Sequence, residues 1–90
     1  FYGLFHPHSM TPLSLQEVPS VRALRGEEVI AEEIFLKNEN VPEGRHLECT
    51  ARPLLHERAS VGAVLSLRDT TAKVEAIRQH DEEQIKIETA

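Results

Sequence analysis

The sequence predicts an α+β domain with one short helix, a sheet of three antiparallel strands and a terminal helix. Three observations predict this order. Residues 19–25 have helical spacing of apolar side chains and are followed by a glycine. Three strand-like segments then follow, separated by turn-forming residues. From residue 72 onward, the composition is that of a solvated helix. Strands in hairpin succession beside segregated helices are typical of the α+β class.

Length and charge narrow the functional classes. Ninety residues predict one small domain, which we divide into a body of residues 1–71 and an outgoing helix of residues 72–90. The net charge of −5 provides no basic stripe, so we expect no nucleic-acid partner. A single cysteine excludes an internal disulfide and suits the cytoplasm. Because the first residue is not methionine, we expect a piece of a longer protein, which could itself be membrane-attached.

The first half of the chain predicts a loop and one short helix. Residues 1–5 are aromatic and β-prone, and two prolines make the next seven residues irregular. Ser14 and Glu17 fit a capping box, and Pro19 suits the first turn of a helix over residues 19–25. We expect Gly26 to end this helix in a left-handed conformation. Its apolar face is predicted to consist of Val18, Val21 and Leu24.

The next two segments predict two strands joined by a turn. Residues 27–37 carry apolar side chains at both parities, with Ile30, Ile34 and Leu36 sharing one of them. Residues 38–44 are turn-rich. Residues 46–54 then alternate, with Leu47, Cys49 and Ala51 on one face, as in a half-buried antiparallel strand. Pro53 should end that strand or lie on an edge.

The third strand, residues 61–67, leads directly into the four residues Arg68, Asp69, Thr70 and Thr71. We interpret these four as a signal junction. Aspartate or threonine at a helix start accepts hydrogen bonds from backbone N–H groups that otherwise have no partner. We therefore expect Asp69 or a neighbouring threonine to cap the helix, with Arg68 or another base nearby. A movement of the strand would then reach the helix.

The order of these segments resembles the C-terminal half of a PAS domain, in the version found in bacterial sensor histidine kinases. The resemblance rests on Tyr2-Gly3, Thr11-Pro-Leu13, Pro19-Ser-Val-Arg-Ala-Leu-Arg-Gly-Glu27, Ala51-Arg-Pro-Leu54, Gly62-Ala-Val64 and Arg68-Asp-Thr-Thr71. It departs from the family at Thr70, where an isoleucine or valine is usual. The first two strands of a complete PAS domain have no counterpart, so the last strand, residues 61–67, would lack a neighbour.

The resemblance implies a sensory and dimerisation module of a bacterial signal-transduction protein. A histidine kinase is the favoured parent, and a diguanylate cyclase, a phosphatase or a transcription regulator are alternatives. The effector domain would follow the signalling helix in the same chain. The fragment itself is expected to be no enzyme, since Glu32 and Glu33 point to opposite faces and form no acid–base pair. A small catalytic subunit is the alternative from another class.

No cofactor or metal ion is expected. His6, His8 and Met10 could bind a soft metal ion, but loop histidines explain them better. Haem-binding relatives carry a histidine on the helix that corresponds to residues 19–26, and this chain has none there. Cys49 alternates with buried positions, which favours an inert thiol over a flavin or redox cysteine. A phosphoacceptor role for His80 is less favoured than a solvated helix face.

A homodimer is the expected assembly. The body is too small to expose an apolar strand edge without a large loss of stability. We expect association through the sheet and the N-terminal aromatic segment, with little contribution from the terminal helix. In that helix the heptad positions after Val74 and Ile77 are polar. The small-molecule ligand is unknown. The candidate dimer or pocket surface consists of Phe1, Tyr2, Phe5, Leu47, Cys49, Leu65 and Leu67.

Overall fold

The computed structural model describes the backbone of residues 3–89 and the side chains of residues 3–80. The predictions for Phe1, Tyr2 and the heptad positions beyond His80 lie outside these described residues. The elements in chain order are β1 (Leu4–Phe5), the 3-10 turn η1 (Leu15–Glu17), α1 (Pro19–Leu24), β2 (Val29–Asn38), β3 (Val41–His56), β4 (Ala59–Asp69) and α2 (Thr71–Thr89).

The sheet has four strands in the order β1-β2-β3-β4, and each neighbouring pair is antiparallel. The α+β class is confirmed, but the prediction of three strands is wrong. The fourth strand forms because Leu4 and Phe5 pair with Leu36 and Phe35 of β2. The N–H of Leu13 donates to the carbonyl of Leu4 at 2.9 Å, which ties the following loop to the new strand.

The strand β3 is longer than the predicted residues 46–54. β3 continues through Pro53 because its ladder with β2 ends at Ala51, and Pro53 pairs only with Ala63 of β4. The turn before β3 is only two residues long. The side chain of Asn38 closes it by accepting the N–H groups of Asn40 and Val41 at 2.9 and 3.1 Å.

β4 also extends beyond the predicted residues 61–67. Arg68 and Asp69 are its last two residues, and α2 begins at Thr71 rather than at residue 72. Only Thr70 separates the strand from the helix. β4 has β3 on one side and, among the described residues, no strand on the other.

A bulge in β2 overturns the predicted facing of that strand. The sequence pattern places Ile30 and Ile34 on one face, yet Ile30 is 66% exposed and Ile34 is buried. The register with β3 shifts between Val29 and Glu32. Ala31 adopts a positive φ of 50° within this shift, and its N–H donates to Thr50 Oγ1 at 3.1 Å. One extra residue therefore reverses the alternation of β2.

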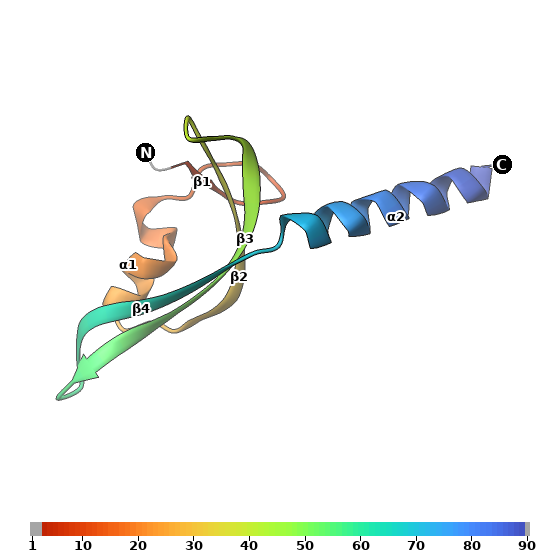
Figure 1. Cartoon of the computed structure of the whole chain (residues 1–90). Coiled ribbons are helices and arrows are strands. Elements are labelled where there is room, and N and C mark those ends of the chain that lie inside the picture. Colours follow the sequence, from red (N-terminus) through yellow and green to blue (C-terminus); the bar gives the residue numbers. More distant parts are fainter. Residues whose placement is uncertain (1–2, 90) are drawn as a thin grey trace.

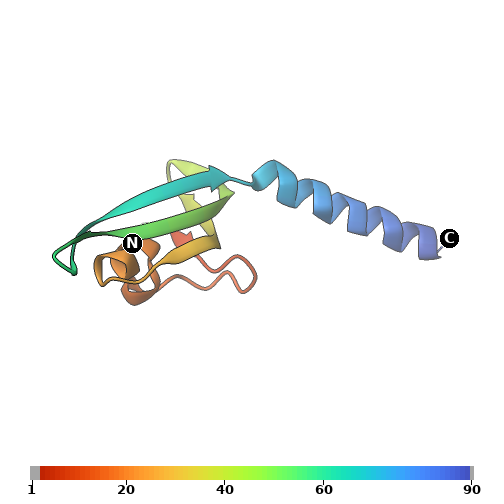
Figure 2. The same cartoon turned by 90° about the horizontal axis from the view of Figure 1, so that it is seen from below.

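The helix α1 covers one face of the sheet, as Figures 1 and 2 show. Its contact residue is Ala23, which is fully buried against Val29 and Ala51, with Ala63 packed beside them. These small side chains allow close approach, and the hydroxyl of Ser60 reaches the carbonyl of Ala23 at 3.2 Å. The predicted face is thus partly wrong, because Leu24 is exposed.

The ends of α1 follow the sequence pattern. Pro19 occupies the first turn, and Gly26 after the helix has a φ of 95°. The predicted capping box lies at the preceding turn η1, where the Glu17 carboxylate accepts the N–H of Ser14 at 2.9 Å.

The other helix, α2, projects away from the sheet in both views of the ribbon (Figures 1 and 2). No helix within the described part of the chain has the length and apolar character needed to cross a bilayer.

Candidate functional site

The junction between β4 and α2 is held by the side chain of Asp69. Its Oδ1 accepts the backbone N–H of Thr71 at 2.9 Å, and its Oδ2 lies 2.8 Å from Nε of Arg45. Asp69 therefore joins the end of β4, the start of α2 and the strand β3 at one point. The carboxylate at a helix start also interacts favourably with the helix dipole.

A second set of hydrogen bonds ties the helix start to the backbone of β3. The N–H of Thr70 donates to the carbonyl of His46 at 2.8 Å, and the N–H of His46 donates to Oγ1 of Thr71 at 2.9 Å. The carbonyl of Thr70 accepts the N–H of Val74 at 2.9 Å, so Thr70 is the N-cap residue of α2. Thr71 is only 7% exposed, which is unusual for a polar residue at a helix start.

The charge of Asp69 is strongly stabilised. The hydrogen bond from Arg45 and then that from Thr71 hold the pKa of Asp69 well below its usual range. The same contact raises the pKa of Arg45. Both groups of the pair are therefore ionised at neutral pH.

Arg45, rather than Arg68, is the base at this junction. Arg68 lies opposite Glu48 in the β3–β4 ladder, with its Nη2 atom 3.7 Å from the Glu48 carboxylate. Successive strand residues point to opposite faces, so Arg68 and Asp69 cannot share a face. The expectation of Arg68 or another base beside Asp69 is therefore met by Arg45.

Sequence reasoning missed Arg45 and His46 because both depend on the register between β3 and β4. Leu47 pairs with Asp69, which brings the two preceding residues of β3 beside the junction. The pairing shifts by one residue between Leu54 and Leu55. Counting back from the hairpin turn without this bulge would place His46, not Leu47, opposite Asp69. The polar turn at Glu57 and Arg58 could have suggested the register of the hairpin. Nothing in the sequence indicates the bulge that shifts this register.

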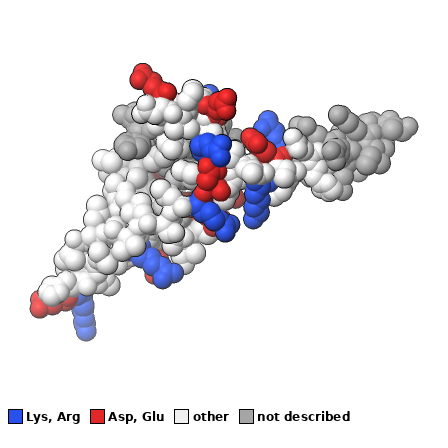
Figure 3. Space-filling model, in the orientation of Figure 1, with Lys and Arg blue, Asp and Glu red and all other residues white. Residues whose placement is uncertain are grey.

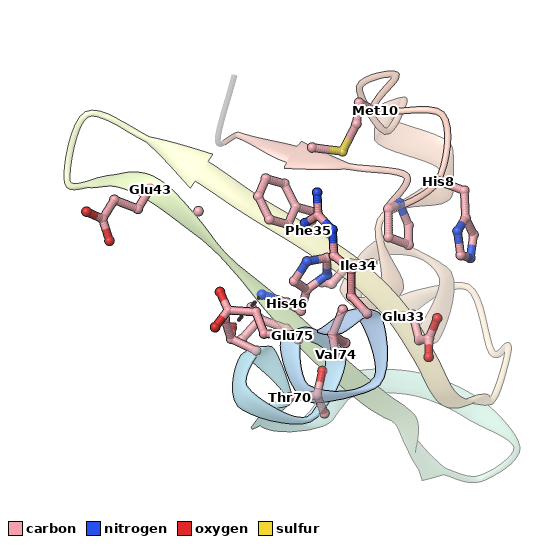
Figure 4. A pocket seen from close by; sticks show the side chains of 15 residues that line it. His8, Met10, Glu33, Ile34, Phe35, Glu43, His46, Thr70, Val74 and Glu75 are labelled. Atoms are coloured by element: carbon pink, nitrogen blue, oxygen red, sulfur yellow. Dashed lines mark hydrogen bonds between the residues drawn. The ribbon is translucent and has the colours of Figure 1, made fainter. Parts of the chain in front are cut away.

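An aromatic cluster lies next to the junction. The rings of Phe35 and His46 have centroids 4.8 Å apart and are tilted by 57°. Gly44 has a φ of 78°, and its missing side chain leaves room for the Phe35 ring. A cavity of about 520 Å³ opens beside these rings and reaches Thr70 and the first turns of α2 (Figure 4).

The chain that forms this sheet, short helix and outgoing helix is similar to one known protein family. A family model described as the PAS fold matches residues 6–75. The chain belongs to the PAS fold family. The match covers every strand except β1 and ends at Glu75 in α2, so the junction lies within it. Neither the curated proteins nor the solved structures gave a significant match.

The residues predicted as a dimer or pocket surface differ in how far the PAS domain exposes them. Leu65 and Leu67 are 44% and 58% exposed, whereas Cys49 is 1% exposed within its own chain. Leu47 is half-buried, and so is Phe5 in β1. Figure 3 shows a largely uncharged surface over the β3–β4 hairpin. On the two faces of this hairpin together, the exposed large apolar side chains are Leu54, Leu55, Val61, Val64, Leu65 and Leu67.

The described histidines and acidic residues of this PAS domain form no evident metal centre. Within residues 3–80, no group of three or more histidine, cysteine, aspartate or glutamate side chains has suitable geometry. His6 instead lies 2.8 Å from the carboxylate of Glu17, which joins the N-terminal loop to η1. His8 and Met10 line the cavity described above.

We predict that Cys49 reacts slowly with thiol reagents in the folded domain. Burial, and to a smaller extent the charge of Glu32, raises the pKa of its thiol, so little thiolate is present at neutral pH. Labelling with a neutral disulfide reagent at pH 7.5 should be slow, and should become fast in denaturant. Equal rates in both conditions would show that Cys49 is accessible in the native state.

Proposed function

We propose that this PAS domain is a sensory and dimerisation module of a bacterial signal-transduction protein, with a histidine kinase as the favoured parent. It does no chemistry itself, acts in the cytoplasm and changes the activity of an effector that follows α2 in the longer chain. The observation that supports the proposal most is the junction. A strand of the sheet passes into the outgoing helix through the single residue Thr70.

The hydrogen bonds at this junction favour transmission over independent movement of the parts. Thr70 and Thr71 each bond to the backbone of His46, and Asp69 bonds to both Arg45 and Thr71. A shift of β3 against β4 therefore breaks these bonds or moves the first turn of α2. A ligand or partner that favours one arrangement of the sheet would thereby favour one position of the helix.

The alternative parents, a diguanylate cyclase, a phosphatase or a transcription regulator, would use the same junction. The effector domain in the parent sequence distinguishes them from a histidine kinase. A small catalytic subunit would differ in kind, since the isolated chain would then show turnover. That result would contradict the proposal.

A change in the rotational phase of α2 tests whether this helix transmits the signal from the sheet to the effector. Each inserted residue rotates the following helix by about 100°, because a turn contains 3.6 residues. Inserting two residues after His80 in the full-length parent should change the effector's response to its signal. Inserting seven residues restores the phase to within about 20° and should retain the response. If both insertions behave alike, the orientation of α2 does not carry the signal.

The dimerisation part of the proposal rests on β4. Leu65 and Leu67 share the face of Ala63, the face on which α1 packs, yet both remain exposed. β4 also has a free edge among the described strands. Exposed apolar edges of this kind tend to associate with another chain. In the proposed dimer, the sheet faces that carry Leu65 and Leu67 in the two chains pack against each other and bury these side chains.

We predict that Leu67→Lys converts the dimer into a monomer, since a buried lysine at the contact would leave a charge without a partner. Light scattering after size-exclusion chromatography at micromolar concentration measures the mass. Val64→Lys is the matched control, because Val64 is 54% exposed on the same strand but points to the opposite face. A dimer that tolerates Leu67→Lys, or one disrupted only by Val64→Lys, would contradict this interface.

A further inference from the structure

Two adjacent apolar residues of β2 compete for one place in the core. Val29 lies opposite Ala51, packs against Ala23 of α1 and is 3% exposed. Its neighbour Ile30 is 66% exposed. The larger of the two side chains is thus left in water, which is unfavourable because hydrophobic stabilisation increases with the apolar area that is buried.

The bulge in β2 decides which of the two residues is buried. Glu32 lies opposite Cys49. Three residues earlier on β2, Val29 lies opposite Ala51, which is only two residues further along β3. If the ladder continued from Glu32 without the extra residue, Ile30 would lie opposite Ala51 instead. Because successive strand residues point to opposite faces, Ile30 would then replace Val29 on the face that α1 covers.

The bulged arrangement carries a backbone strain that a regular ladder does not need. Ala31 has a φ of 50°, which lies in the left-handed region that residues with a Cβ atom disfavour. In a regular ladder Ala31 would be extended and opposite Thr50. Ala31 is exposed, so this change removes no buried contact of its side chain. A strained residue of this kind persists only where the surrounding contacts hold it.

Two contacts hold the strained arrangement. The N–H of Ala31 donates to Oγ1 of Thr50 at 3.1 Å. Arg22 of α1 spans the bulge, since its Nε lies 2.9 Å from Glu27 before the bulge and its Nη1 lies 2.9 Å from Glu32 after it. A slip by one position changes the separation of these two carboxylates, so it costs Arg22 one of its contacts.

We propose that the first part of β2 is a two-register switch, in which residues 27–30 slip by one position and Ile30 replaces Val29 in the core. The structure has the bulged register. In the regular register the strain at Ala31 is relieved and the larger side chain is buried, whereas the contacts of Thr50 and Arg22 are lost. These opposing changes are of similar kind and size, and the minor state of such an equilibrium is commonly populated at about 0.1–10%.

The switch would move α1 relative to the sheet. Ala23 is fully buried against Val29 and Ala51, so a larger side chain in the place of Val29 displaces the helix. The carbonyl of Ala23 accepts the hydroxyl of Ser60 at 3.2 Å, and Ser60 belongs to β4, the strand that ends at the junction. A role in signalling rests on the proposed sensory function, whereas the register itself can be measured in the 90-residue chain alone.

A substitution at Ala31 tests the switch, because the two registers require different conformations there. Ala31→Val should make the regular register the major one, since a β-branched residue strongly disfavours a positive φ and favours an extended strand. Nuclear Overhauser effects between methyl groups should then connect Ala23 with Ile30 rather than with Val29. Glu33→Val is the matched control, since Glu33 is an exposed residue in the regular part of β2, and it should keep the contact between Ala23 and Val29. Persistence of that contact in Ala31→Val, or failure of this variant to fold, would overturn the proposal.

Two further variants shift the equilibrium in opposite directions. Thr50→Val removes the acceptor for the Ala31 N–H and should raise the population of the regular register about twofold to tenfold, as expected for one hydrogen bond. Thr50→Ser keeps the hydroxyl and is its control. Ala31→Gly removes the strain of the bulged register and should lower the same population about fivefold to thirtyfold.

Chemical exchange saturation transfer on the Ile30 methyl groups measures these populations. Equal populations in Thr50→Val and Thr50→Ser, or no minor state in either the unsubstituted chain or Thr50→Val, would contradict the switch. In the full-length parent, Ala31→Gly should weaken the response of the effector. A response that persists although the exchange is suppressed would count against the signalling role alone.

Discussion

Gly44→Ala should lower the free energy of unfolding by about 2–5 kcal/mol, a large share of what a domain of this size has. Two effects add. A φ of 78° costs a residue with a Cβ atom about 1–2 kcal/mol, and a Cβ at this position would overlap the Cζ atom of Phe35. Overpacking of this kind typically costs about 1–3 kcal/mol more. Thermal or denaturant unfolding followed by circular dichroism measures the change.

Gly26→Ala is the matched control for this prediction. Gly26 has a similarly positive φ of 95°, but a Cβ there would meet no atom within 4 Å. It should therefore show the conformational cost alone, about 1–2 kcal/mol. Replacing Phe35 with leucine in the Gly44→Ala background should recover part of the loss. If both glycine variants are equally stable, the contact between Gly44 and the Phe35 ring is not what limits this position.

Asp69→Ala in the full-length parent should uncouple the effector from the sensor while leaving the PAS domain folded. The substitution removes the acceptor for the Thr71 N–H and the partner of Arg45, but it removes no buried apolar group. Coupling free energies between sites commonly correspond to a 5-fold change or more, so we expect the ratio of stimulated to basal output to fall at least about fivefold. The measurement is effector activity with and without the signal, beside the unfolding midpoint of the domain.

Asp69→Asn separates the two contacts. Asparagine keeps a side-chain oxygen for the Thr71 N–H but loses the charge that faces Arg45. An intermediate loss of coupling is therefore expected. Glu28→Ala serves as a control. Glu28 is an exposed carboxylate that also faces an arginine, with its Oε1 3.8 Å from Nε of Arg52, but it lies away from the junction. A parent whose response survives Asp69→Ala would show that the cap does not transmit the signal.

How much the sequence could predict varies along the chain. The helix over residues 19–25, its proline start and the glycine after it were correct because local rules for capping decide them. The alternation of Leu47, Cys49 and Ala51 was sufficient to predict β3, and Cys49 and Ala51 are 1% and 0% exposed. The step from an apolar strand to Asp69 and the threonines was likewise sufficient to locate the junction, because helix caps favour these residue types.

The errors lie where two segments must be aligned. Residues 1–5 are β-prone, but β1 is only two residues long, and the sequence does not say that it pairs with Leu36 and Phe35 of its own chain. The face of the sheet on which Ile30 lies depends on a bulge at Ala31, and the amino-acid sequence does not predict this bulge.

The sequence alone determined the class of the fold, the PAS resemblance and the place where strand becomes helix, because each depends on neighbouring residues. Only the tertiary structure decided that Asp69 pairs with Arg45, that His46 anchors both threonines and that a cavity forms beside Phe35. All three follow from the register of β3 against its neighbours. A strand pairing that slips by one residue moves every side chain to the opposite face, and hydrophobic pattern alone does not fix that slip where bulges occur.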